Sequence, residues 1–394
     1  MRPPLRPVQR TAAYGVVNDG SGALLLLRVP AGGDPAGRWS LPGGVVRHGE
    51  HPRDRVRAGL LEQTGLRAAS ITPRDAGADV VELPDEGISV HTLRLLFDVT
   101  LYGTPAGIPG PGRPAVDRRS PSEQGDRLLG EDPAALDPSD ELPAPVALVV
   151  TPDPDRPVAQ FVGRFMAPGE LVGLPLSRFL APLLEGNSSD ETLLLTGGPD
   201  LLDPPLDPAS LAVPVPSLDE VPAFVQRPAA YAVLVNEKAD GGPQMLLSRL
   251  AGSESTWTLP GGGIDHGEHP RPALRREIHE EAGLPYTEGP LIDISSRHFV
   301  GRGPHGRLED FHALRLIYAG SVPFDQEPQV MEVDGSTDEA AWIPIADLDT
   351  AGAVPTAHDA LAAWQAYRDG EGLEAVMDRA ADARGDEMID RPGS

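Results

Sequence analysis

The stretch that decides the fold reads GGIDHGEHPRPALRREIHEEAGL and occupies residues 262–284. Pro270 to Glu281 is predicted to form a helix, because proline suits a first helical turn and Gly283 can cap the C-terminal end. Apolar residues recur at helical spacing on one side of this segment, namely Ala273, Leu274 and Ile278. The stretch therefore predicts a glycine loop followed by an amphipathic helix.

Three carboxylates share another side of this helix. Glu277 precedes Glu280 by three residues and Glu281 by four, which brings the side chains together. Such a group is unfavourable unless a cation lies among the carboxylates, and oxygen ligands favour Mg²⁺, with Mn²⁺ as the alternative. Arg276 can orient or screen the group, and Gly261–Gly263 offers a backbone carbonyl or room for a phosphate. A metal site of this kind generates hydroxide from bound water and binds phosphate oxygens.

A solvated helix face is the alternative interpretation of the same acidic run. Glutamate and arginine at helical spacing are common on exposed surfaces. Here the glycine loop and Glu268 accompany the run at fixed spacing, and that combination favours the metal site.

The chain contains the same blocks twice, which predicts two copies of one domain. Residues 8–14, 39–44, 48–53 and 91–95 return in order as residues 225–231, 257–262, 266–271 and 312–316. Further on, Phe165 and its neighbours resemble Trp342 and its neighbours, at a clearly smaller offset. Strands are predicted at 14–17, 23–29, 92–101, 231–236, 245–250 and 311–318, and a final helix in each copy at 177–184 and 357–367.

Residues 262–284 also resemble the Nudix box, the signature of the Nudix hydrolase family, at every defined position. The resemblance implies an α/β fold made of two tandem α/β/α sandwich domains with mixed sheets. It also implies hydrolysis of a nucleoside diphosphate linked to another group. By this similarity Glu277 and Glu281 are metal ligands, Glu280 lies beside them, and the Gly261 carbonyl is a further ligand. Glu277 is also a candidate to orient or deprotonate the attacking water, a role that varies across the family.

The first copy has lost most of this charge. Three of the five charged positions are lost, since Ala58, Gly59 and Gln63 stand where the second copy has Arg276, Glu277 and Glu281. Glu50 and Glu62 keep their carboxylates. The first copy is therefore predicted to keep the fold without activity and to serve packing, dimerisation or ligand sensing.

These observations divide the chain into four parts. A degenerate Nudix-like domain covers 1–196, a linker 197–216, an intact Nudix domain 217–370, and a C-terminal helix and tail 371–394. The first domain carries an insertion at about 104–143, where 8 Pro, 5 Gly and no aromatic residue occur. Such a segment buries too little apolar surface to fold alone.

Composition excludes several classes of protein. The 394 residues contain no cysteine, which excludes disulfides, thiolate metal sites and cysteine nucleophiles. A formal charge of −26 argues against binding to a nucleic-acid duplex or an anionic membrane surface. The sequence shows no signal peptide and no apolar run of membrane-spanning length, so a cytoplasmic protein is expected.

Several weaker candidates remain open. Arg249 and Arg315 are candidates for substrate phosphate binding, with a salt bridge as an equal alternative for each. Asp338 and Glu339 are read as an exposed acidic turn, and as a distal carboxylate pair in the alternative. The histidines at 279 and 312 and Trp257 are assigned to packing, and residues 296–309 are expected to form a loop that sets substrate specificity.

The leading functional hypothesis is a Mg²⁺-dependent pyrophosphohydrolase that works from the second domain on a nucleotide-type small molecule. The alternative is a non-catalytic sensor of nucleotide-sugar or ADP-ribose ligands. A scaffold protein explains the linker but leaves the carboxylate group without a purpose. A homodimer is compatible with the sequence.

Overall fold

The computed structural model describes most of both predicted domains. The described residues are 4–31, 34–102, 148–149, 162–180, 190–197, 201–202, 223–302, 308–332 and 335–370. The predicted insertion at 104–143 and the tail at 371–394 lie outside them. Of the helix predicted at 177–184, Ser177 is not helical, residues 178–179 form a turn, Leu180 is helical, and residues 181–184 lie outside the described residues.

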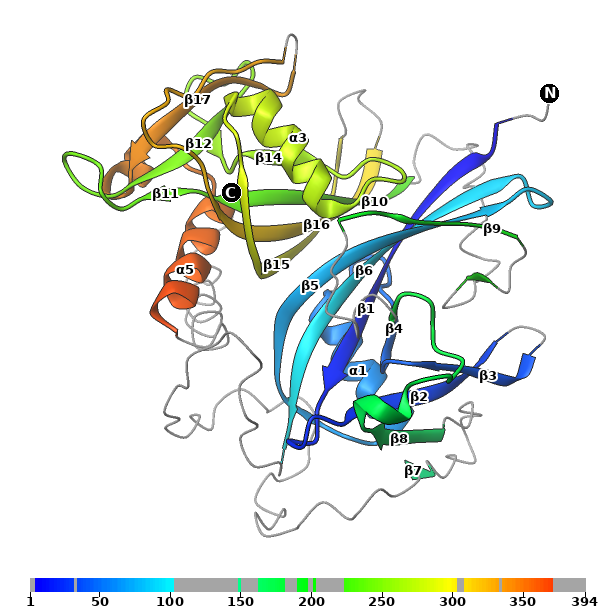
Figure 1. Cartoon of the computed structure of the whole chain (residues 1–394). Coiled ribbons are helices and arrows are strands. Elements are labelled where there is room, and N and C mark those ends of the chain that lie inside the picture. The colour runs from blue at the N-terminus through cyan, green and yellow to red at the C-terminus, as the bar shows by residue number, and fades with distance from the viewer. Residues whose placement is uncertain are drawn as a thin grey trace, which may run out of the picture.

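The first copy consists of two sheets and a helix (Figure 1). The larger sheet has the order β4 (Gly43–Val45), β1 (Arg6–Val17), β6 (Ile88–Leu101), β5 (Ala68–Leu83) and β9 (Leu193–Thr196). It is mixed, because β1 is parallel to β6 and antiparallel to β4. The smaller sheet has the order β3 (Asp34–Ser40), β2 (Leu24–Ala31), β8 (Val162–Met166) and β7 (Leu148–Val149), followed by the short 3-10 helix η2 (Pro168–Glu170). Helix α1 (Pro52–Thr64) packs on β1 and β4.

The second copy repeats this arrangement. Its larger sheet has the order β14 (Gly261–Gly263), β10 (Ala223–Val233), β16 (Leu308–Ser321) and β15 (Thr287–Arg302). In the smaller sheet β12 (Gln244–Leu250) pairs with β11 (Val235–Asn236), β13 (Trp257–Thr258) and β17 (Thr337–Pro344). Helix α3 (Pro270–Ala282) packs on β10 and β14, and the chain continues through η5 (Ile345–Asp347), α4 (Leu348–Ala351) and α5 (Pro355–Asp369).

Strand register supports the repeat that the sequence predicts. Leu25 of β2 pairs with Phe165, and Leu246 of β12 pairs with Trp342, so the two aromatic residues occupy equivalent positions. The extra length of the first copy therefore lies between β6 and β8. The predicted fold class, two tandem α/β domains with mixed sheets, is confirmed.

Two predictions of local structure are wrong. Residues 296–302 belong to β15 and not to a loop, because their backbone pairs with β16 as far as Arg302 and Leu308, while residues 303–307 lie outside the described residues. Asp338 and Glu339 are exposed, as expected, but they lie in β17 and not in a turn. Both segments are held by ladder hydrogen bonds to a neighbouring strand.

The predicted linker starts as part of the first copy. Leu202 is only 4% exposed and packs with Val81 and Val90, next to the edge strand β9. Backbone pairing of β9 with β5 and this contact hold residues 193–197 and Leu202 against the first domain.

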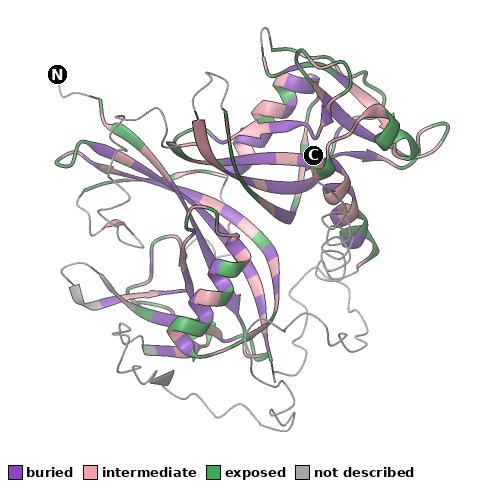
Figure 2. Cartoon of the chain, turned by 180° about the vertical axis from the view of Figure 1, so that it is seen from behind, coloured by how far each residue is buried: buried purple, intermediate pink, exposed green. Residues whose placement is uncertain are grey.

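The two copies pack against each other through β5 and β15. A single cluster of buried apolar residues contains residues from both copies. Figure 2 shows that buried residues occur along the strands of both copies. Two reciprocal ion pairs cross the interface, Arg53 with Asp293 at 3.2 Å and Arg271 with Asp75 at 3.2 Å. The copies therefore present equivalent surfaces to one another within one chain. None of the helices in the described part of the chain is long and apolar enough to span a membrane.

Candidate active site

Helix α3 carries the carboxylate group, and its ends are fixed as the sequence predicts. His269 is the N-cap residue and its Nδ1 accepts a hydrogen bond from the backbone N–H of Arg271 at 3.3 Å. Gly283 ends the helix in the left-handed conformation, with φ of 65°. Ala273, Leu274 and Ile278 are buried in the core, so the glutamates on the adjoining side face the glycine loop.

Glu281 is the most deeply placed carboxylate of the group. Its side chain is buried, with 2% exposure for the residue, and accepts a hydrogen bond from the Gly261 N–H at 2.9 Å. Burial raises the pKa of Glu281 to about 7, although the hydrogen bond from Gly261 stabilises the ionised carboxylate and acts in the opposite direction. A divalent cation at this position would favour the ionised form and offset that burial cost.

Glu277 lies directly against the next glycine. A Cβ atom on Gly262 would come within 2.4 Å of Glu277 Oε2, so the approach of the carboxylate to the loop requires glycine. Burial raises the pKa of Glu277, while the neighbouring Arg276 guanidinium lowers it. The glycine loop and helix α3 are therefore in direct contact at this position.

Arg276 supplies the positive charge within the group. It pairs with Glu268 through Nε at 3.1 Å and Nη2 at 2.9 Å, and its Nη1 lies 2.8 Å from Glu277 and 3.2 Å from Glu280. Its Nη2 also donates to the Gly263 carbonyl at 3.1 Å. These bonds raise the pKa of Arg276 far above its ordinary value. Arg276 therefore fixes the positions of three carboxylates at once.

Sequence reasoning missed one further carboxylate, Glu332. The backbone N–H groups of Met331 and Glu332 donate to the carbonyl of Glu280, at 2.8 and 3.1 Å. This contact holds the segment after β16 beside the end of α3, where the charge of Glu332 raises the pKa of Glu277 and Glu281. Glu332 lies about fifty residues from the helix in sequence, so periodicity gives no signal for it.

The donor set fits a hard divalent cation. Glu277, Glu280 and Glu281 offer carboxylate oxygens, Glu332 adds a nearby negative charge, and the Gly261 carbonyl belongs to the same loop. Oxygen ligands and an excess of negative charge are what Mg²⁺ and Mn²⁺ prefer.

The two arginines assigned to phosphate binding have different surroundings. Arg249 pairs with Asp338 at 2.8 Å and Glu339 at 2.7 Å, so its charge is matched within the chain. Arg315 lies on β16 beside Tyr231, whose phenol pKa is raised by burial and lowered by Arg315. The Arg315 Nη1 atom is buried with no hydrogen-bond partner among the described residues.

Strand register places more positive charge beside Arg315. Ala313 pairs with Arg227 on one side and Arg297 on the other, while Arg315 is two residues further along β16, on the same sheet face. Tyr231 lies on this face too, and its pKa responds to the charges of Arg227, Arg315 and Glu281. A positive surface therefore adjoins the carboxylate group.

The other weak candidates differ in their burial. Trp257 is buried in the core near α5. His312 is fully buried near the interface between the copies, as a packing residue would be, whereas His279 is exposed on α3 and does not pack in the core.

The equivalent place in the first copy is closed by its own side chains. Gln63 accepts from the Gly43 N–H at 2.9 Å and donates to the Gly43 carbonyl at 3.0 Å. A Cβ atom on Gly59 would lie 2.8 Å from the Gly43 Cα, so the helix and loop are in close contact. Arg55, one turn before Ala58, pairs with Glu62 at 2.9 Å and lies 3.8 Å from Glu50.

Comparison with known proteins agrees with the repeat. The model of the NUDIX domain matches residues 8–108 and 225–365. An RNA pyrophosphohydrolase of Cellvibrio japonicus is 41% identical over 97 residues, which cover 25% of this chain and 49% of that protein. One of Saccharophagus degradans is 38% identical over 130 residues, covering 30% of this chain and 74% of that protein.

The chain thus spans about half the length of the first of these relatives. Among solved structures, a MutT NUDIX hydrolase from Burkholderia pseudomallei is 24% identical, with a TM-score of 0.26 over 34% of this chain and 95% of that chain. The two segments matched by the NUDIX model together make up more than half of the sequence. The chain belongs to the NUDIX domain family, of which it contains two copies in tandem.

Proposed function

We propose that the second copy hydrolyses a pyrophosphate bond in a nucleoside diphosphate linked to another group. The observation that carries the proposal is the convergence of Glu277 and Glu281 on the Gly261–Gly262 loop. Burial, together with the neighbouring carboxylates, raises the pKa of both residues, and a buried group of carboxylates of this kind favours a bound cation and an anionic substrate.

The residues that would hold Mg²⁺, with Mn²⁺ as the alternative, are Glu277, Glu280, Glu281 and the Gly261 carbonyl. When bound, the ion supplies charge stabilisation to phosphate oxygens and lowers the pKa of bound water. Arg276 acts as a positioning residue, because it holds Glu277 and Glu280 through its Nη1 atom.

Glu277 is the residue that we assign to orient or deprotonate the attacking water. It is half-buried, it lies at the glycine loop, and its carboxylate is held in one position by Arg276. A general base must lie within hydrogen-bond distance of the attacking water, and a carboxylate that is held in one position beside the glycine loop is suited to this role.

Arg315, with Arg227 and Arg297 on the same sheet face, is the favoured contact for the substrate's negative charge. Guanidinium groups bind phosphate through paired hydrogen bonds, and the buried Nη1 of Arg315 has such a bond to offer. Arg249 is less suited to this role, because Asp338 and Glu339 match its charge.

The test is release of phosphate or nucleotide from a panel that includes nucleoside diphosphate sugars and 5′-triphosphorylated RNA, the latter chosen from the names of the relatives. Full-length protein is assayed with Mg²⁺, with Mn²⁺ and with a chelator. Metal-dependent turnover of at least one substrate is expected. Tight binding of a nucleotide without turnover would instead favour the non-catalytic sensor.

A further inference from the structure

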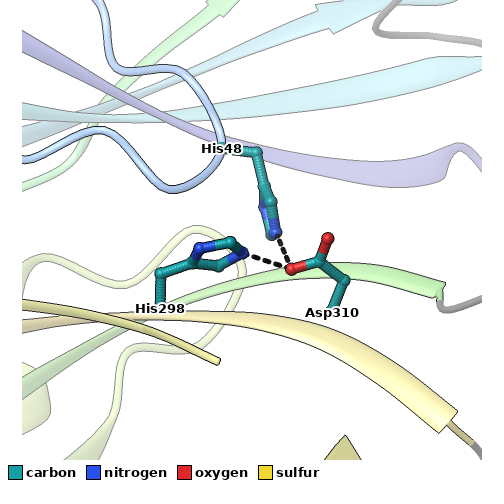
Figure 3. A group of neighbouring side chains, drawn as sticks. All are labelled: His48, His298 and Asp310. Carbon is teal, nitrogen blue, oxygen red and sulfur yellow. Dashed lines mark hydrogen bonds and ion pairs between the residues drawn. The ribbon is translucent and has the colours of Figure 1, made fainter. Parts of the chain in front are cut away.

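Two histidines and an aspartate meet where the copies face each other, away from the carboxylate group (Figure 3). His48 lies in the loop between β4 and α1 of the first copy. His298 lies on β15 and Asp310 on β16 of the second copy. One nitrogen of each histidine and one oxygen of Asp310 lie within 4.8 Å of one another.

Both imidazoles point to the same carboxylate oxygen. His48 Nε2 lies 2.9 Å from Asp310 Oδ1, and His298 Nε2 contacts the same atom. The side chains remain reachable from solvent, since that of His48 is 24% exposed and that of His298 43%. The group therefore combines three converging donor atoms with a route of entry.

His312 packs beside the three donors, and hydrogen bonds hold its ring in one position. Its Nδ1 accepts a hydrogen bond from the Gly49 N–H at 3.1 Å, and a backbone amide can only donate. Its proton is therefore on Nε2, which donates to Ser296 Oγ at 2.9 Å. The ring centroid of His312 lies 5.6 Å from that of His48, so His312 limits the movement of His48 without joining the three donors.

The reciprocal half of the interface lacks two of the three donors. His266 takes the place of His48 and contacts His91 at 5.6 Å between ring centroids, as His48 contacts His312. Strand register places Val80 opposite His91, as His298 is opposite His312. Ser89 takes the place of Asp310, and its Oγ lies 3.0 Å from His266 Nε2.

This difference shows that the interface does not need the group. The same packing is made in the other half with a valine and a serine. His298 and Asp310 are the additional donors, and they occur on one side only.

We propose that His48, His298 and Asp310 form a binding site for a transition-metal ion of the Zn²⁺ class, with water as the fourth ligand. Imidazole suits Zn²⁺ and its neighbours in the first row, whereas Mg²⁺ prefers oxygen ligands alone. Tetrahedral Zn²⁺ sets its ligand atoms about 3.3 Å apart, so the rings of both His48 and His298 would move away from Asp310 to accommodate the ion.

The site would join the two copies. One ligand comes from the first copy and two from the second, so a bound ion adds a link across the interface. Because it binds the folded chain, the ion would also raise the unfolding temperature. This inference does not depend on the proposed hydrolase activity.

The experiment is calorimetric titration of full-length protein with Zn²⁺ in the presence of saturating Mg²⁺, which occupies the carboxylate group. One Zn²⁺ per chain is expected. His298→Val and Asp310→Ser, which copy the residues of the other half, are expected to weaken binding by at least about a hundredfold. His266→Ala is the matched control and should leave Zn²⁺ binding unchanged.

Introducing the two missing donors into the other half of the interface tests whether these donors are sufficient to create a metal site. Val80→His combined with Ser89→Asp should create a second site beside His266 and raise the stoichiometry to two. Circular dichroism checks the fold of every variant. No Zn²⁺ binding by the wild-type chain, or undiminished binding by both His298→Val and Asp310→Ser, would overturn the proposal.

Discussion

Helix α1 with β4 and helix α3 with β14 are the same local structure, yet they treat the space between helix and glycine loop in opposite ways. In the first copy Gln63 bonds both the N–H and the carbonyl of Gly43. In the second copy Glu281 accepts from the Gly261 N–H and gathers with other carboxylates. In the first copy the polar groups of Gln63 and Gly43 satisfy one another. In the second copy the carboxylates leave an excess of negative charge, which favours the binding of a cation.

The two copies place an arginine among their carboxylates from different helix positions. Arg276 of the second copy bridges Glu268 and Glu280. In the first copy that position is Ala58, and Arg55, one turn earlier, lies between the equivalent Glu50 and Glu62. The charge of the remaining carboxylates is thus balanced by a residue that leaves the helix–loop contact undisturbed.

The largest expected difference between the copies is in turnover. Glu277→Gln and Glu281→Gln should each lower hydrolysis by about a thousandfold, or about 4 kcal/mol in the barrier, because each removes a negative ligand. The measurement is metal-dependent release of phosphate or nucleotide by full-length protein.

Glu62→Gln in the first copy is the matched control and should leave turnover unchanged. Activity within tenfold of wild type in both second-copy variants would contradict the assigned site.

The second difference concerns stability. In metal-free protein Glu281→Gln should raise the free energy of unfolding at pH 8 by up to about 3 kcal/mol, because the pKa of Glu281 is about 7 in the fold against 4.5 ordinarily. Glutamine keeps the bond to the Gly261 N–H, as Gln63 does with Gly43. Denaturant unfolding of variant and wild type with a chelator present gives the difference.

The stability gain of Glu281→Gln depends on pH because the pKa of Glu281 is raised in the folded protein. Above pH 7 the fold must hold a buried ionised carboxylate, which costs stability, and the cost disappears as pH falls towards 4.5. The gain from Glu281→Gln should therefore be largest at pH 8 and absent near pH 4.5. An equal gain at both pH values would show that ionisation is not its cause.

The third difference is steric. Gly59→Glu should cost about 1–3 kcal/mol, because its Cβ would meet the Gly43 backbone at 2.8 Å. The triple change Ala58→Arg, Gly59→Glu and Gln63→Glu is therefore expected to destabilise the first copy and to build no Mg²⁺ site. Restoring the charges alone is therefore not expected to restore the site.

Gly77→Ala is the control for this substitution, since a Cβ there meets no atom within 4 Å. Thermal unfolding and Mg²⁺ titration are the measurements. A stable triple variant that binds Mg²⁺ would mean that helix α1 can move away from the loop.

The sequence predicts much of this structure, and what it misses has a common cause. The helix from Pro270, its Gly283 cap and the tandem copies follow from local spacing and repetition. Glu332 and the positive face around Arg315 depend on strand register and on segments distant in sequence. The contact of Gly59 with Gly43 is equally invisible, because a missing side chain says nothing about how closely the backbone approaches.

The smallest expected difference concerns Arg55 and Arg276, the arginines that pair with carboxylates in the first and the second copy. Arg55→Ala should cost about 1 kcal/mol, because Glu62 is largely exposed and water replaces most of its ion pair. Arg276→Ala removes the charge that lies among Glu268, Glu277 and Glu280, and leaves their mutual repulsion in place. Mg²⁺ binding to the second copy can compensate for that repulsion.

Thermal unfolding with and without Mg²⁺ distinguishes the two variants. For Arg55→Ala the loss of stability should be the same under both conditions, since the first copy is expected to hold no ion. For Arg276→Ala it should be clearly smaller with Mg²⁺ than with a chelator. If Mg²⁺ rescued Arg55→Ala to the same extent, the ion would be bound by the first copy as well, and the contrast between the two helix–loop sites would fail at its central point.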